Sequence, residues 1–182
     1  DGNVYKIEGG GDKKNQGPTQ PTTTSDWNAF ASASRTTQAE SWWRTNMNMP
    51  VFYSFHAMNR LTGNIDLRHN YNHYFYHHTD GRWMVMPWDM DMMFIPETHW
   101  PGVIDQNNSL NIANLRTEFR NRCREILDLM CSDASDDGGQ IGQLIDEYAD
   151  IVNPPNLALT WADVDEAMWN WHPQARGNNQ PS

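Results

Sequence analysis

Oxygen-bearing side chains gather in one short stretch of the sequence, residues 64–94. Asp66 precedes a run of aromatic residues, Asn72 stands at the start of that run, and Asp89 and Asp91 follow a second apolar run. Carboxylate and amide oxygens are the ligands that Mg²⁺, Mn²⁺ and Ca²⁺ prefer, whereas zinc prefers nitrogen and sulfur. The stretch therefore indicates a site for a hard divalent cation.

A β-hairpin is the element that would position these side chains. Residues 72–77 and 82–86 read as two strands, and the link between them contains Asp80-Gly81, a strong turn signal. A hairpin brings its two open ends together. We therefore expect the oxygen ligands before the first strand to approach those that follow the second.

Such a cluster suits phosphoryl transfer. In that chemistry one carboxylate accepts the proton of the attacking hydroxyl, while an Asn and a second Asp hold the metal ions that neutralise the phosphates. We expect Asp66 to be the catalytic base, Asn72 and Asp89 to be metal ligands, and Asp91 to assist them. The simpler alternatives are a turn or helix-cap residue for Asp66, a polar residue of an edge strand for Asn72, and solvent-exposed strand ends for Asp89 and Asp91.

Other side chains of the same stretch have two interpretations each. Trp83 can stack on an adenine ring or serve as a core aromatic, and Arg68 can pair with a phosphate or remain on the surface. Four histidines suggest zinc, but their spacing matches neither HExxH nor a Cys-His pattern. Surface or core positions are the simpler interpretation for them: His69, His73, His77 and His78.

The motifs of this stretch resemble those of the spore-coat-protein-H (CotH) kinase family, which are atypical, secreted or surface-associated protein kinases. The resemblance rests on Asn64-Ile65-Asp66, on Asn72 ahead of Tyr74-Phe75-Tyr76, on Gly81-Arg82-Trp83 and on Pro87-Trp88-Asp89-Met90-Asp91. It implies that Asp66 is the catalytic aspartate and that Asp89 corresponds to the metal-binding Asp of a kinase DFG motif. Asn72, or its rival Asn70, matches the metal-binding Asn, and Tyr5-Lys6 matches a motif ahead of this region, which makes Lys6 a candidate for nucleotide binding.

This resemblance implies an ATP-dependent kinase that transfers the γ-phosphoryl group to Ser or Thr hydroxyls of proteins with Mg²⁺ or Mn²⁺. It also implies an extracellular or cell-surface location, such as a spore coat. Family kinases carry an upstream N-terminal lobe with a phosphate-binding Lys, so we expect this chain to be an excised part that is active when joined to one. The alternatives are a non-catalytic, adhesin-like or coat-forming module of the same fold and a metal-dependent hydrolase.

Composition excludes several classes of protein. The 182 residues include 23 acidic and 13 basic ones, for a net charge of −10, which argues against nucleic-acid binding and against adhesion to anionic membranes. Nine Trp argue against disorder. No stretch approaches the roughly 18 consecutive apolar residues that a membrane span needs.

The pattern of elements predicts an α+β fold, mostly helical, with one hairpin that carries the site. The resemblance to CotH kinases implies the architecture of a kinase C-lobe. We expect a single domain over residues 1–172, with a mobile loop or insertion at residues 9–25 and a polar tail at residues 173–182. Asp26 is expected to cap the first helix. Besides a strand at residues 4–7, apolar periodicity predicts helices that begin near residues 27, 38, 49, 113, 140 and 161.

Overall fold

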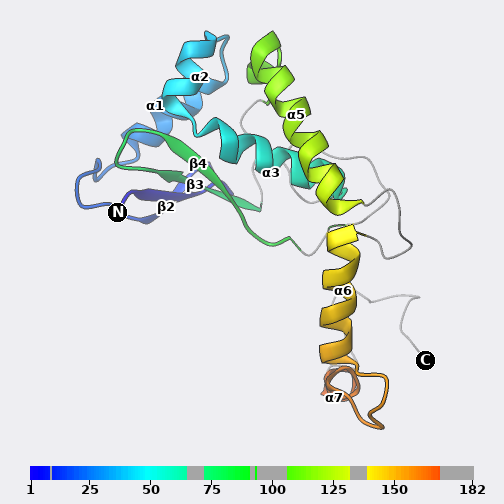
Figure 1. Ribbon diagram of the computed structural model, residues 1–182. Helices are drawn as coiled ribbons and strands as arrows, with labels where there is room; N and C mark the ends of the chain where they lie inside the picture. Colours follow the sequence, from blue (N-terminus) through cyan, green and yellow to red (C-terminus); the bar gives the residue numbers. More distant parts are fainter. Residues whose placement is uncertain (9, 65–71, 91–92, 94–105, 132–138, 169–182) are drawn as a thin grey trace, which may run out of the picture. The chain divides into compact units, whose positions relative to one another are not determined.

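The computed structural model of the chain (Figure 1) describes residues 1–8, 10–64, 72–90, 93, 106–131 and 139–168. The chain divides into two compact units, residues 1–127 and residues 128–182. The sheet and those predicted site residues that the structure describes all belong to the first unit. No helix among the described residues is long and apolar enough to cross a membrane.

Four short strands form one antiparallel sheet in the order β2-β1-β3-β4. The predicted hairpin is present, and its register runs from His73 opposite Pro87 to His77 opposite Trp83. The strand expected at residues 4–7 is confirmed as the inner strand β1. The four strands are β1 (Asn3–Lys6), β2 (Asp12–Asn15), β3 (His73–His77) and β4 (Trp83–Pro87).

The segment at residues 9–25, which we expected to be a mobile loop, contains strand β2. Its sequence Asp-Lys-Lys-Asn has no apolar residue that would signal a strand, because β2 lies at the sheet edge with mostly exposed side chains. Lys13 Nζ donates hydrogen bonds of 2.6 Å to the carbonyls of both Pro21 and Thr23. Pairing with β1 and these bonds order a segment whose composition predicts a loop.

The helices largely follow the apolar periods of the sequence. Helix α4 is the exception, since its five residues are too few to show an apolar period. The helices of the described residues are α1 (Ser25–Ser34), α2 (Glu40–Asn46), α3 (Met49–Leu61), α4 (Gln106–Leu110), α5 (Ala113–Met130), α6 (Gly139–Val152) and α7 (Trp161–Met168).

Two helices begin with side-chain caps of the residue types that are favoured there. Asn48 Oδ1 accepts a hydrogen bond of 3.3 Å from the Val51 amide at the start of α3. Thr160 and Asp163 cap α7 reciprocally, because each side chain accepts from the amide of the other. Asp26 does not cap α1, which begins after Thr24 and leaves Asp26 in its first turn.

One face of the sheet carries an aromatic core. Side chains alternate along a strand, so Tyr5, Phe75 and Trp83 point to the same side. They pack against Trp27 and Phe30 of α1, with ring centroids 4.8 Å apart for Phe30 and Trp83 and 5.4 Å apart for Trp27 and Phe75. This packing fixes α1 on the sheet.

Helix α3 is attached to the same sheet at its start and at its middle. At its start the Asn48 amide donates a hydrogen bond of 2.8 Å to the carbonyl of Trp83 in β4. At its middle Phe55 lies against His73 of β3, with ring centroids 6.1 Å apart. Because α3 ends at Leu61, this attachment also fixes the start of the segment that contains Asp66.

Candidate functional site

The open end of the β3–β4 hairpin brings together two segments that carry predicted metal ligands. Asn72 directly precedes β3, and Asp89 follows β4 by two residues. The amide of Trp88 donates a hydrogen bond of 3.3 Å to the carbonyl of Asn72 across this end. The structure thus places Asn72 beside the residue that precedes Asp89, as the hairpin geometry predicts.

Asn72 and Asp89 share an unusual backbone conformation. Their φ angles are +57° and +54°, and the other described residues with positive φ are all glycines. This left-handed region costs a typical residue about 1 kcal/mol or more, although Asn and Asp tolerate it better than most. Such conformations concentrate at functional sites, where the surrounding structure holds them in place.

The two candidate ligands differ in exposure. Asn72 is 9% exposed, whereas the side chain of Asp89 is open to solvent. The two side chains therefore differ in their access to solvent. Both supply hard oxygen atoms of the kind that Mg²⁺ and Mn²⁺ prefer.

Lys6 adds a positive charge to this surface. It stands on β1, opposite Tyr74 of β3, and its Nζ lies 2.6 Å from Glu8 Oε2. The hydrogen bond to Glu8 raises the pKa of Lys6 above its ordinary value, and the charge of Asp89 adds a smaller contribution in the same direction. The Lys6 ammonium and the Asp89 carboxylate therefore attract each other electrostatically.

Trp83 lies in the aromatic core with 3% of its surface exposed. Its ring stacks nearly parallel on that of His77, with centroids 4.2 Å apart, and on that of Phe30 at 4.8 Å. A nucleotide base could reach the ring only after one of these neighbours moved. The position fits the core interpretation of Trp83, the alternative to adenine stacking.

Three other predicted site residues lie outside the described residues, namely Asp66, Arg68 and Asp91, as does Asn70, the rival of Asn72. Their roles remain predictions. Among the residues that the structure describes, no group of three or more His, Cys, Asp or Glu side chains could hold a metal ion.

The described histidines of the stretch have partners within the fold. His73 is fully buried and lies edge-on to Phe75. His77 Nδ1 is 2.8 Å from a carboxylate oxygen of Asp26, and His78 Nδ1 is 3.0 Å from Asp80. These contacts agree with core and surface positions for these three side chains.

Asp26 is the important residue that sequence reasoning misjudged. Its carboxylate is 7% exposed and accepts hydrogen bonds from the Tyr5 hydroxyl at 2.5 Å and from Asn3 Nδ2 at 3.0 Å, in addition to His77. Burial raises the pKa of Tyr5, and the Asp26 carboxylate raises it further. An Asp at a helix start reads as a cap, and the local sequence carries no signal for partners on β1 and β3.

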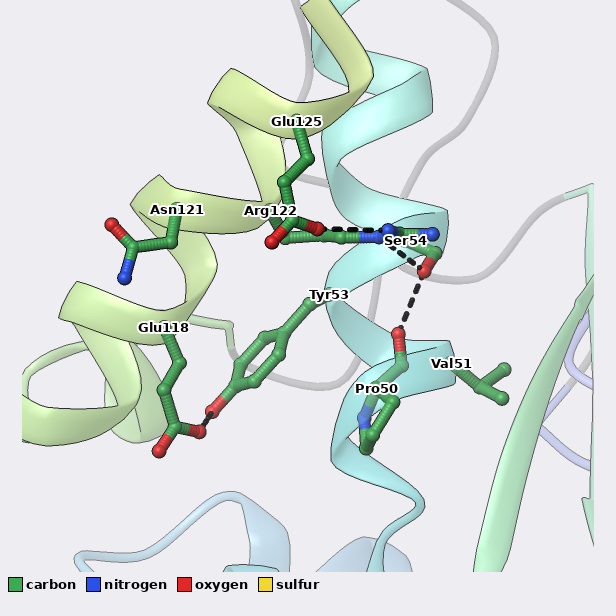
Figure 2. A pocket seen from close by; sticks show the side chains of 8 residues that line it. All are labelled: Pro50, Val51, Tyr53, Ser54, Glu118, Asn121, Arg122 and Glu125. Atoms are coloured by element: carbon green, nitrogen blue, oxygen red, sulfur yellow. Dashed lines mark hydrogen bonds and ion pairs between the residues drawn. The ribbon is translucent and has the colours of Figure 1, made fainter. Parts of the chain in front are cut away.

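A groove of about 630 Å³ lies between α3 and α5 in the first unit. Figure 2 shows that side chains of both helices line it: Pro50, Val51, Tyr53, Ser54, Glu118, Asn121, Arg122 and Glu125. Most of its charged groups already have partners. Arg44 Nη2 and the Tyr53 hydroxyl bind Glu118 at 2.6 and 3.0 Å, and Arg122 binds Ser54 and Glu125 at 3.0 and 2.9 Å. These hydrogen bonds across the groove fix α5 on α3.

The Glu118→Ala variant tests this contact. Because it leaves the half-buried Tyr53 hydroxyl and one side of Arg44 without a partner, we expect it to lower the free energy of unfolding by about 1–2 kcal/mol. Urea unfolding followed by Trp fluorescence measures the loss. Glu125→Ala is the control, since that side chain is 61% exposed and its pair with Arg122 is worth well under about 1 kcal/mol. Equal losses in both variants would contradict the assignment.

Comparison with known proteins accounts for most of the chain. The family model described as CotH kinase protein matches residues 1–133, which include the whole sheet, Asn72 and Asp89. No curated protein and no solved structure matches the chain significantly. The match confirms the resemblance that the motifs of residues 64–91 indicate, and the chain belongs to the CotH kinase family.

Proposed function

We propose that this chain is the metal-binding part of an atypical protein kinase that transfers the γ-phosphoryl group of ATP to Ser or Thr hydroxyls of a protein. One observation carries the proposal. The open end of the hairpin places the segments of Asn72 and Asp89 side by side, and both residues adopt a left-handed backbone. Family membership supplies the class of reaction.

Asn72 and Asp89 would hold Mg²⁺ or Mn²⁺ through their side-chain oxygens, with Asp91 assisting. The bound ion would supply positive charge to the phosphates of the nucleotide. Two paired strands fix the backbone from which both ligands project, so little reorganisation is needed when the ion binds. The paired strands would thus hold the ligands in fixed positions.

Other side chains of the protein would accept the proton and offset the phosphate charge. Asp66 would accept the proton of the attacking hydroxyl. Lys6 and Arg68 would offset the charge of the phosphates. The acceptor is a protein, and the family suggests action at the cell surface or on a spore coat.

Calorimetric titration of ATP into the chain tests the proposal directly. We expect binding in the presence of Mg²⁺ or Mn²⁺ and none in excess EDTA, because the acidic site repels a nucleotide that carries no metal. Incubation with γ-labelled ATP and dephosphorylated casein then separates the reaction classes. Label on casein supports a kinase, whereas release of free phosphate alone supports a hydrolase.

The absence of metal-dependent binding would overturn the proposal for this chain. It would favour the non-catalytic binding or coat module, which needs neither nucleotide nor metal. Circular dichroism before and after addition of EDTA controls for loss of folded structure.

A further inference from the structure

The second unit exposes a continuous apolar stripe along α6. Its members recur every three or four residues and so share one face of the helix. Between 46% and 64% of each of the five outermost side chains is open to solvent. The stripe, which we name the α6 stripe, consists of Ile141, Leu144, Ile145, Tyr148, Ile151 and Val152.

A groove of about 410 Å³ continues the α6 stripe at its C-terminal end. Ile151 belongs to both, and the groove is otherwise lined by residues of α7 and of the loop before it, among them Leu157, Leu159 and Trp161. Leu159 and Trp161 are 69% and 72% exposed. A contiguous apolar surface of this extent is rare on a protein that acts alone and marks an interaction site.

Electric charge is distributed very unevenly between the two units. Residues 128–182 hold ten of the 23 acidic residues and one of the 13 basic residues, so they carry a net charge of −9 out of −10. Residues 1–127 are nearly neutral. Asp146, Glu147 and Asp150 are exposed on the same helix as the stripe, and Asp163 and Asp165 are exposed on α7. Asp146 and Asp150 lie on the face of α6 opposite the stripe and Glu147 lies beside it, so the acidic charge belongs to the unit as a whole rather than to a rim around the apolar surface.

We propose that the α6 stripe and the adjoining groove dock a basic amphipathic helix of a partner protein. The apolar face of such a helix would cover the stripe, and its Lys and Arg side chains would be attracted by the net charge of −9 on residues 128–182. Charge selects this occupant over the others. A second copy would bring another charge of −9 against this one, and an anionic lipid surface would be repelled.

Fluorescence anisotropy with the full chain and a defined probe tests the proposal. The probe is a labelled 18-residue peptide with Leu at positions that repeat every three and four residues and Lys elsewhere. We expect a dissociation constant on the order of 10 μM. Two control peptides should bind at least about tenfold more weakly. One has the same residues in scrambled order, and the other has Glu in place of Lys.

Matched variants locate the binding surface. The double variant Leu144→Gln, Ile151→Gln is expected to weaken binding at least about tenfold, because both side chains are about half exposed and central to the stripe. The triple variant Asp146→Asn, Glu147→Gln, Asp150→Asn should weaken it by about tenfold as well. Leu127→Gln is the control, since that side chain is 43% exposed but lies in the first unit, and it should leave binding unchanged.

Three results would overturn the proposal. Equal binding of the scrambled peptide would show that charge alone is responsible. Concentration-dependent dimerisation in sedimentation equilibrium, lost in the double variant, would show that a second copy covers the stripe. Slow hydrogen exchange of α6 in the free chain that becomes fast in the double variant would show that the chain covers the stripe itself.

Discussion

Replacing Asp89 with Gly is expected to abolish metal-dependent ATP binding while leaving the free energy of unfolding unchanged or slightly higher. The carboxylate is a proposed metal ligand, so its loss removes a negative charge and an oxygen ligand from the proposed site. The backbone of Asp89 has a φ of +54°, a conformation that Gly adopts without steric cost. Relief of that strain offsets the greater entropy of Gly in the unfolded chain. Calorimetry measures the first effect and urea unfolding the second.

Companion variants separate the ligand role from the backbone role. Asp89→Ala should lose binding and also stability, by about 1 kcal/mol, because Ala cannot adopt the left-handed region cheaply. Asn72→Gly should behave as Asp89→Gly does. Asp66→Asn should keep nucleotide binding and reduce phosphoryl transfer by about 10²–10⁴-fold, as expected for loss of a general base. Asp80→Asn, at the closed end of the hairpin, is the control and should bind ATP as the unmodified chain does.

Normal ATP binding by Asp89→Gly would show that Asp89 is not a metal ligand. Loss of stability in that variant, without loss of binding, would show that the left-handed turn has a purely structural role. The two measurements therefore test the chemistry and the backbone independently.

Replacing Asp26 with Ala is expected to lower the free energy of unfolding by about 3–5 kcal/mol, a large part of the stability of a typical domain. The variant leaves the Tyr5 hydroxyl, the Asn3 amide and the His77 imidazole without their shared acceptor inside the fold. Urea unfolding followed by Trp fluorescence gives the loss. Asp80→Ala is a matched control. Like Asp26, Asp80 contacts a histidine, and it also contacts Arg82, but it does so on the surface, so this variant should lose far less stability.

Acid unfolding should depend on the same carboxylate. Burial acts to raise the pKa of Asp26, but hydrogen bonds from Tyr5, His77 and Asn3 outweigh it and hold the pKa below the ordinary value of 3.8. A depressed pKa means that the contribution of Asp26 is present above pH 3.8 and is lost as the pH falls through the lower folded-state value. Asp26→Asn should therefore flatten the loss of stability below about pH 4. An unchanged loss of stability at acid pH in this variant would contradict this account.

Tyr5 gives the opposite dependence at high pH. Its pKa is raised above the ordinary value of 10.0 by burial and by the Asp26 carboxylate. A raised pKa means that its contribution is complete below pH 10 and is lost as the pH rises toward the folded-state value. Tyr5→Phe should therefore reduce the loss of stability at alkaline pH and leave the loss of stability at acid pH unchanged.

Local patterns predicted the elements whose signals are themselves local. The hairpin follows from two apolar runs around Asp80-Gly81, and α5 follows from an apolar period that spans its full length. Strand β2 and the role of Asp26 could not be predicted in this way. Both depend on partners in distant segments, and neither carries an apolar pattern of its own.

The candidate site was predictable to the same extent. Hairpin geometry alone implies that Asn72 lies near the segment of Asp89, and the Trp88 amide confirms this proximity. The left-handed backbone of both residues could not be foreseen, because Asn and Asp also occur in ordinary turns. The burial of Trp83 depends on the packing of α1, which no pattern within the hairpin reveals.

The position of β1 within the sheet has a consequence for how the chain folds. β1 is an inner strand, since it pairs with the neighbouring β2 on one side and with the distant β3 on the other, so that Tyr5 lies opposite Phe75. During synthesis the N-terminal hairpin can form early, but its inner edge has no partner until β3 has left the ribosome. Closing the long loop between β1 and β3 costs conformational entropy before the strands gain any contacts with each other, and this cost slows folding. We expect refolding to be slow for a chain of this length, and the unpaired edge of β1 to be the main point of aggregation while it lasts.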